Sequence, residues 1–225
     1  MDSHLVPASV ILFDCDGVLV DSDSSVDRSW TRWALEYGLD PDRVIETVHG
    51  RRTTDTVALL IPPDDQAAAL SAIDSYELED AGTATEIAGA RELVASMPSS
   101  RWAVVTSGRR ALARARLQAA GIDPPPVLVS ADDVAAGKPD PEGYLAAAAA
   151  LGVAAADAIV MEDSRTGVEA GRRARVGNVV GVGSRALSTD ADIVVRDLTS
   201  LRWDNGLHIP QTSVLSRDSA GGSPD

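Results

Sequence analysis

The chain has 225 residues, 44% of them hydrophobic, and a formal net charge of −14 at pH 7. This length and hydrophobic content are sufficient for a buried core, and the negative charge disfavours nucleic acid and anionic membrane surfaces as partners. One cysteine and three histidines exclude an internal disulfide and a cysteine-rich or histidine-rich zinc site, so a bound metal would need oxygen ligands.

The N-terminal segment MDSHLVPASVILFD has neither the basic region nor the long apolar run of a secretion signal. No other stretch reaches the roughly eighteen apolar residues of a membrane span. We therefore expect a cytoplasmic protein, a monomer whose partners are small ligands rather than membranes or nucleic acid.

Short apolar runs that end in small or polar residues predict buried strands. They cover residues 9–14, 102–107, 126–130 and 158–163, with weaker runs at 178–182 and 191–195. Helices are predicted between the later strands, at residues 109–120, 141–151 and 164–175. This alternation predicts an α/β fold with a Rossmann-like parallel sheet covered by helices on both faces.

The segment between the first two predicted strands breaks the alternation. It shows helical periodicity without a convincing strand and is too long for an ordinary crossover. We predict an inserted α-helical cap domain at residues 22–96 and a core formed by residues 7–21 and 97–205. The last segment, 206–225, is rich in Ser, Gly and Pro and is predicted to be disordered.

Polar residues gather where the predicted strands end. They are Asp14 and Asp16 after the first strand, Thr106 and Ser107 at the end of the second, and Glu162 and Asp163 at the end of the fourth. Because ligands of open α/β sheets bind outside the carboxyl ends of the strands, we expect these side chains to converge. Clustered carboxylates without His or Cys suit Mg²⁺.

Lys138 is the only lysine in a chain with nineteen arginines, and it precedes a predicted helix on the same edge. Its rotatable ammonium can touch both a carboxylate nucleophile and a phosphoryl oxygen, where the wide, planar guanidinium would need more room. No Cys or Ser–His pair is placed for attack, so we expect a carboxylate nucleophile. Asp16, two residues beyond Asp14, is placed to act as general acid and base.

Four segments resemble, in order, the motifs of the haloacid dehalogenase (HAD) superfamily of phosphohydrolases. They are DCDGVLVDS (14–22), VVTSG (104–108), GKPDPEGY (137–144) and VMEDSRTGVEAG (160–171), and the resemblance spans about residues 9–197. The family carries a helical cap after its first motif, where this chain has its helical insertion. The cap closes over the site, excludes water and selects the leaving group.

The resemblance implies a role for each matching residue. These roles are Asp14 as nucleophile, Asp16 as acid/base, Thr106 and Lys138 on the phosphoryl group, and Mg²⁺ held by Asp14, the Asp16 carbonyl and Asp163, with Glu162 behind them. Further residues near the motifs and in the cap are predicted to bind substrate. They are Ser107, Gly108, Arg52 and His49.

Within the family, the segments at 46–57, 101–117 and 130–144 look most like the glycerol-phosphate and 2-deoxyglucose-6-phosphate phosphatases. The phosphoglucomutase-like branch has a cap arginine and a histidine at the places of Thr53 and Val26. We therefore predict a Mg²⁺-dependent phosphatase of a small phosphorylated sugar or polyol. The alternatives are a β-phosphoglucomutase-like phosphomutase and a phosphoaspartate receiver-type switch, which would place its acidic pair differently and lack the cap.

Overall fold

The computed structural model describes residues 3–48 and 51–216. Its main element is a six-stranded sheet in the order β6-β5-β2-β7-β8-β9, in which every neighbouring pair is parallel. The strands are β2 (Val10–Phe13), β5 (Trp102–Val105), β6 (Leu128–Val129), β7 (Ala158–Glu162), β8 (Asn178–Val182) and β9 (Ile193–Val195). The predicted α/β fold with a Rossmann-like parallel sheet is confirmed.

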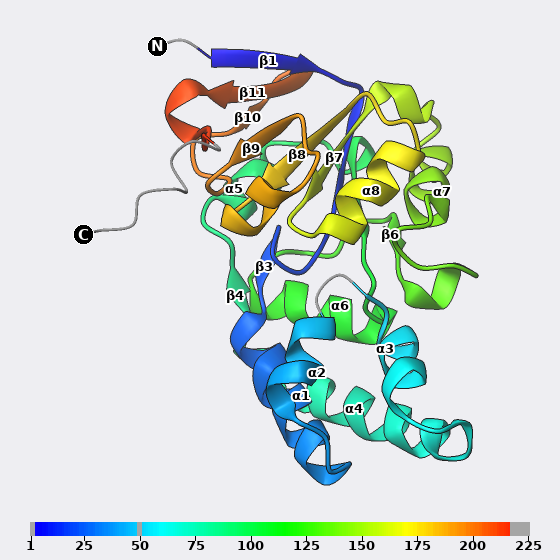
Figure 1. The fold of residues 1–225 in the computed structure, drawn as a ribbon. Helices are drawn as coiled ribbons and strands as arrows, with labels where there is room; N and C mark the ends of the chain where they lie inside the picture. The colour runs from blue at the N-terminus through cyan, green and yellow to red at the C-terminus, as the bar shows by residue number, and fades with distance from the viewer. Residues whose placement is uncertain (1–2, 49–50, 217–225) are drawn as a thin grey trace.

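Helices cover both faces of this sheet (Figure 1). They are α5 (Ala90–Ala95), α6 (Arg110–Ala119), α7 (Glu142–Ala150) and α8 (Arg165–Arg173). Ile11 and Phe13 of β2 belong to the hydrophobic cluster that includes α5 and α6, whereas Val10 and Leu12 belong to the one that includes α7 and α8. Because β2 is buried on both faces, polar side chains are confined to the strand ends, as expected of a parallel sheet.

Four of the helices between β2 and β5 form an insertion that packs around a hydrophobic cluster of its own. They are α1 (Asp23–Glu36), α2 (Pro41–Val48), α3 (Thr53–Leu60) and α4 (Gln66–Asp80). Trp30, Trp33 and Ile73 are among its most buried side chains. These helices form the lower lobe in Figure 1. Two short antiparallel strands, β3 (Val20–Asp21) and β4 (Thr85–Glu86), lie where the chain enters and leaves it.

Helix α5 lies within residues 22–96, which we predicted to be the cap, but it packs into the core. Its residues Ala90, Leu93 and Val94 belong to the same cluster as Phe13 of the central strand. Helical periodicity shows which face of a helix is apolar, but it does not show against which hydrophobic core that face packs. The predicted cap boundary at residue 96 is therefore too late by at least this helix.

The prediction that residues 206–225 are disordered is wrong for residues 206–216. Gly206–Pro210 form β11, which pairs antiparallel with β1 (Ser3–Pro7) and β10 (Arg202–Trp203). Leu207 and Ile209 are fully buried. Their alternation with polar residues is a strand pattern that the Ser, Gly and Pro content of the segment obscured. Residues 217–225 lie outside the described residues.

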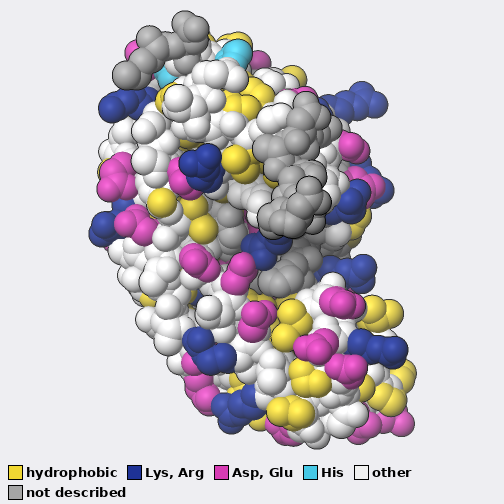
Figure 2. Space-filling model, turned by 60° about the vertical axis from the view of Figure 1, so that its left-hand side comes forward, with side chains coloured by type: hydrophobic (Ala, Val, Ile, Leu, Met, Phe, Trp, Pro, Cys, Tyr) yellow, Lys and Arg dark blue, Asp and Glu magenta, His cyan; other side chains and the backbone are white. Residues whose placement is uncertain are grey.

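None of the helices in the described residues has both the length and the hydrophobicity needed to cross a bilayer. Figure 2 shows acidic and basic side chains interspersed on one face of the molecule. Among the described residues visible on that face, the basic side chains do not merge into a continuous patch.

Candidate active site

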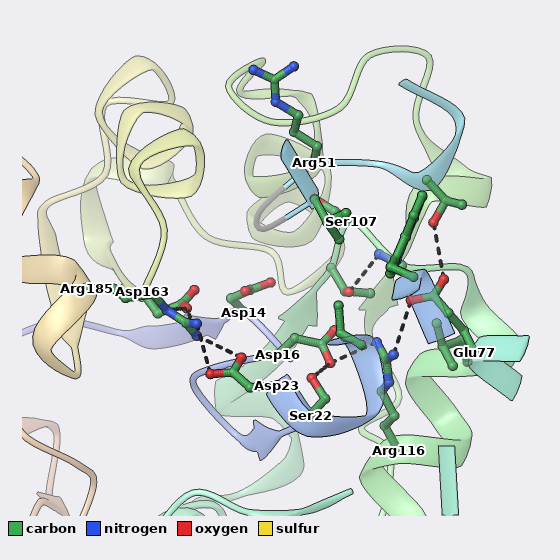
Figure 3. Close-up of a pocket in the computed structure, with 17 residues that line it drawn as sticks. Asp14, Asp16, Ser22, Asp23, Arg51, Glu77, Ser107, Arg116, Asp163 and Arg185 are labelled. Carbon is green, nitrogen blue, oxygen red and sulfur yellow. Dashed lines mark hydrogen bonds and ion pairs between the residues drawn. The ribbon is translucent and has the colours of Figure 1, made fainter. Parts of the chain in front are cut away.

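Three neighbouring strands supply the centre of the site. Asp14 directly follows β2, Thr106 directly follows β5, and Asp163 directly follows β7. Because β2 lies between β5 and β7 in the sheet, these side chains line one cavity with Ser107 and Gly108 (Figure 3). The cavity has an empty volume of about 650 Å³, part of it open to solvent. The convergence expected from the strand ends is therefore observed for these residues.

The loop after β2 requires glycine at position 17. Gly17 has a φ of +79°, and a Cβ there would lie 2.3 Å from Oδ2 of Asp163. Its amide donates to the carbonyl of Val20 at 2.8 Å, which closes the turn. A side chain at this position would be strained and would displace Asp163.

Asp16 also lines the cavity, and two donors hold one of its oxygens. Its Oδ1 accepts from the Ser22 hydroxyl at 2.6 Å and from Nη1 of Arg116 at 3.0 Å. Neither donor was expected from the sequence. Together they fix the orientation of this carboxylate relative to Asp14.

Lys138 bridges two acidic residues beside the cavity. Its ammonium donates to Oδ1 of Asp14 at 2.7 Å, to Oε1 of Glu162 at 2.6 Å and to the carbonyl of Val105 at 3.1 Å. Burial alone would lower the pKa of Lys138, but Asp14 and Glu162 raise it by more, so the net direction is up. The lysine is therefore cationic, and it contacts the predicted nucleophile.

Glu162 is fully buried and accepts from five donors among the described residues. They are Nζ of Lys138, the hydroxyl groups of Tyr144 and Ser164, and the amides of Asp163 and Ser164. A carboxylate so fully engaged has little capacity left for a metal ion. In this arrangement Glu162 holds Lys138 rather than facing the cavity.

The buried carboxylates form a candidate cation site. Oxygens of Asp14, Glu162 and Asp163 all lie within 4.8 Å of one another. Burial and the charge of Glu162 raise the pKa of Asp163 to about 7, with Arg185 opposing the rise. Burial likewise raises the pKa of Asp14 against the opposing effect of Lys138. Hard oxygen ligands whose charge is costly to bury fit Mg²⁺. Of the three carboxylates, Asp14 and Asp163 are the ones not already saturated by hydrogen-bond donors.

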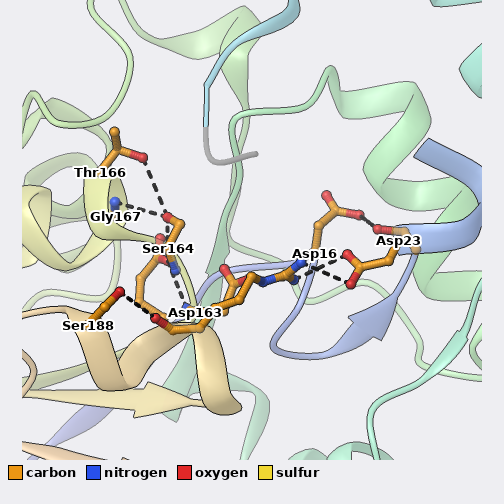
Figure 4. A network of polar contacts seen from close by, with 10 residues as sticks. Asp16, Asp23, Asp163, Ser164, Thr166, Gly167 and Ser188 are labelled. Atoms are coloured by element: carbon orange, nitrogen blue, oxygen red, sulfur yellow. Dashed lines mark hydrogen bonds and ion pairs between the residues drawn. The ribbon is translucent and has the colours of Figure 1, made fainter. Parts of the chain in front are cut away.

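Arg185 joins this acidic cluster to the helical insertion. Its guanidinium donates to Oδ2 of Asp163 at 2.8 Å and to Asp23, at the start of α1, at 2.9 Å. Figure 3 shows Arg185 between the two carboxylates. Figure 4 shows Asp163 beside Ser164 and Gly167 at the start of α8, with Asp23 on the other side of the polar network. Asp163 is thus held from the side of the insertion as well as from the sheet.

Of the two cap residues predicted to bind substrate, Arg52 does not line the cavity that contains Asp14. Its guanidinium pairs with Asp55 at 2.9 Å and donates to the carbonyl of Ala135 at 3.1 Å. The neighbouring Arg51 lines that cavity instead. His49 lies outside the described residues.

Sequence reasoning missed a buried ion pair in the wall of the cavity. Arg116 of α6 donates from Nη2 to Oε1 of Glu77 of α4 at 3.2 Å, and both residues are at most 5% exposed. The signal was present, because Glu77 continues the i, i+4 spacing of buried Ala69 and Ile73. Arg116 likewise stands on the buried face of its helix, beside Leu117. A charge at an apolar position of a helical repeat indicates a buried partner.

An open α/β sheet with a strand-end carboxylate beside a buried lysine is typical of proteins that transfer phosphoryl groups. The family model for haloacid dehalogenase-like hydrolases matches residues 8–175. The chain belongs to this family, as its four motifs predicted, and the prediction that it is an enzyme of a phosphatase family is confirmed.

Known relatives agree with this assignment. The chain is 34% identical to hexitol phosphatase A of Escherichia coli, over 84% of this chain and 91% of that protein. It is 30% identical to 2-deoxyglucose-6-phosphate phosphatase 1 of Saccharomyces cerevisiae, over 93% and 98%. A crystal structure of a hydrolase from Pseudomonas syringae matches with a TM-score of 0.74 and 26% identity, over 84% and 94% of the two chains.

Proposed function

We propose that the protein is a Mg²⁺-dependent phosphatase of a small phosphorylated sugar or polyol, acting through an aspartyl phosphate on Asp14. The observation that carries this proposal is the meeting of Asp14, Asp16 and Thr106 in one cavity, with Lys138 bonded to Asp14. Two relatives, a hexitol phosphatase and a 2-deoxyglucose-6-phosphate phosphatase, support the substrate class.

In the proposed first step, a carboxylate oxygen of Asp14 attacks phosphorus while Asp16 gives its proton to the leaving oxygen. In the second step, Asp16 takes a proton from water, which attacks the phosphoryl group and releases phosphate and free Asp14. Because Ser22 and Arg116 both bind Oδ1 of Asp16, its Oδ2 remains for these proton transfers. The Thr106 hydroxyl would bind one phosphoryl oxygen, and Lys138 would bind another in exchange for one of its three present acceptors.

Asp14 and Asp163, with the backbone carbonyl of Asp16, would hold Mg²⁺. The ion would offset the negative charge that the phosphoryl group brings to this acidic cluster. Glu162 would act indirectly, by holding Lys138 against Asp14.

We further propose that helices α1–α4 form the cap of the enzyme and close the cavity during turnover. Cap residues Val26, Trp30 and Thr53 already line it. A cytoplasmic monomer remains part of the proposal. The phosphomutase alternative is less well supported, because Thr53 and Val26 stand where that branch has its arginine and histidine.

The proposal can be tested by measuring phosphate released from hexitol phosphates, glycerol phosphate and 2-deoxyglucose 6-phosphate, with Mg²⁺ or with excess chelator. We expect turnover that needs Mg²⁺ and is lost in the Asp14→Asn variant. Full activity in chelator, or an active Asp14→Asn enzyme, would contradict the mechanism. Conversion of glucose 1-phosphate to glucose 6-phosphate without net phosphate release would favour the mutase.

A further inference from the structure

The Glu77–Arg116 ion pair spans the boundary between the helical insertion and the core. Glu77 comes from α4 and Arg116 from α6, and their side chains are 6% and 3% exposed. Both line the cavity that holds Asp14, Asp16 and Thr106, and Figure 3 shows the pair on one side of it. A leaving group that extends from a phosphoryl group on Asp14 into this cavity can therefore reach the pair.

Glu77 has unused capacity to accept hydrogen bonds. Its Oε1 binds Arg116, whereas its Oε2 has, within residues 3–48 and 51–216, only a long contact of 3.4 Å with the Thr53 hydroxyl. Burial raises the pKa of Glu77, with Arg116 opposing the rise. A carboxylate has about four acceptor positions, and leaving them unfilled in a buried setting is costly. Hydroxyl groups of a bound substrate would fill them.

Arg116 offers no further donor to a substrate. Among the described residues, its Nε has no hydrogen-bond partner, but this atom is buried and cannot be reached from the cavity. The pair therefore presents the cavity with the acceptors of Glu77. Neutral hydroxyl groups donate hydrogen bonds, so they match these acceptors. Three other lining residues, Val26, Trp30 and Val48, are apolar and suit the C–H surface of a carbon chain.

The charge balance of the cavity disfavours a second anionic group on the substrate. Five acidic residues line it, and they are Asp14, Asp16, Asp23, Glu77 and Asp163. The lining cations are Arg51, Arg116 and Arg185, of which only Arg51 lacks an ion pair within the described part of the chain. Figure 3 shows the guanidinium of Arg51 pointing away from Glu77. A carboxylate beside Glu77 would meet repulsion without a free cation at hand.

We propose that Glu77, held by Arg116, selects the leaving group: it admits an uncharged, hydroxyl-rich chain and rejects one whose far end carries a carboxylate or second phosphate. This inference rests on the proposed phosphatase function and specifies its substrate class. Glu77 acts as a specificity-determining residue, and Arg116 as the residue that positions both Glu77 and Asp16.

Two substrates that differ only at the far end test the inference: sorbitol 6-phosphate and 6-phosphogluconate, in which a carboxylate replaces the terminal CH₂OH. We expect wild-type kcat/KM to favour sorbitol 6-phosphate by about tenfold or more. In Glu77→Gln this ratio should fall by about the same factor. Glu79→Gln is the matched control, because Glu79 lies on the same helix, exposed and paired with Arg32, and its ratio should match wild type.

The ratio separates specificity from structure, because a variant that merely loosens the fold lowers both values of kcat/KM together. An unchanged ratio in Glu77→Gln would overturn the inference, as would a wild-type enzyme that prefers 6-phosphogluconate or does not discriminate. The wild-type comparison stands even if Glu77→Gln fails to fold. A wild-type enzyme that releases no phosphate from any sugar or polyol phosphate would instead contradict the proposed function.

Discussion

Lys138 donates to oxygens of Asp14, Val105 and Glu162, so all three of its N–H bonds are in use. These oxygens surround a compact ammonium whose side chain is only 7% exposed. A guanidinium is planar and wider, and it directs its donors in a fork. The single lysine of the chain thus occupies a position whose geometry suits an ammonium group.

At this residue, we predict that Lys138→Arg lowers kcat by about a hundredfold or more although the charge is kept, because the fork cannot meet the three oxygens in the same space. Steady-state phosphate release would measure the loss, and circular dichroism would check the fold. The reverse exchange at exposed Arg101, Arg101→Lys, should leave kcat unchanged. A Lys138→Arg enzyme with near wild-type kcat would show that only the charge matters.

A second residue-scale prediction concerns Asp163, whose pKa is raised to about 7. A carboxyl group in the unfolded chain has a pKa of about 4. Because the folded value is the higher one, the contribution of this group to the free energy of unfolding is present below about pH 4 and is lost as the pH rises to about 7. The metal-free protein should therefore lose stability over this range relative to Asp163→Asn.

Urea unfolding in chelator across this pH range would measure the difference. Adding Mg²⁺ should reduce it, since the ion binds the charged form of Asp163. The control is Asp190→Asn, at an exposed position. The free energy of unfolding of this variant should match that of wild type at every pH. Parallel stability curves for wild type and Asp163→Asn in chelator would show that burial of this charge is not costly.

At the scale of single elements, the turn from β7 into α8 builds the support for the lysine. Ser164 caps the helix by accepting from the Gly167 amide at 3.1 Å, and it also donates to Glu162. A Cβ on Gly167 would lie 1.7 Å from Oε1 of Glu162. The first turn of α8 therefore needs glycine so that the buried carboxylate can lie against it.

We predict that Gly167→Ala lowers both stability and activity, although alanine is the better helix former. The methyl group must displace Glu162, which costs about 1–3 kcal/mol of folding free energy and releases Lys138 from its position. Thermal unfolding and kcat would be measured together. Gly82→Ala is the control, because a Cβ there meets nothing within 4 Å. A stabilised, active Gly167→Ala protein would mean that Glu162 can move freely.

Elements with continuous apolar runs could be predicted from the sequence almost to their ends, as β2, β5 and β7 show. The convergence of the proposed catalytic carboxylates follows from these strands, because parallel strands place their carboxyl ends together. Glu77 and Arg116 could be recognised as buried charges from their helical spacing. Their pairing could not, since it depends on how the insertion lies on the core. Strand β11 was missed because loop-like composition outweighed a short alternating pattern.

At the scale of the whole molecule, the small sheet β1-β11-β10 ties the two ends of the described chain together (Figure 1). We predict that truncation after Asn205 lowers the free energy of unfolding by at least about 3 kcal/mol, because it removes the buried side chains of Leu207 and Ile209. Urea unfolding would measure the loss. Truncation after Ser216 keeps every described residue of β11 and is the control. Equal stability of both truncated proteins would mean that β11 contributes little.

The pairing of β1 with β11 also has a consequence for biosynthesis. Ser3 lies opposite Pro210, and Val6 lies opposite Leu207. A ribosome releases β1 first, yet its partner emerges only after the insertion and the entire parallel sheet have been made. Until then β1 presents an unpaired edge that can bind other strands. The chain must therefore be translated at least as far as Pro210 before β1 acquires all of its native pairing.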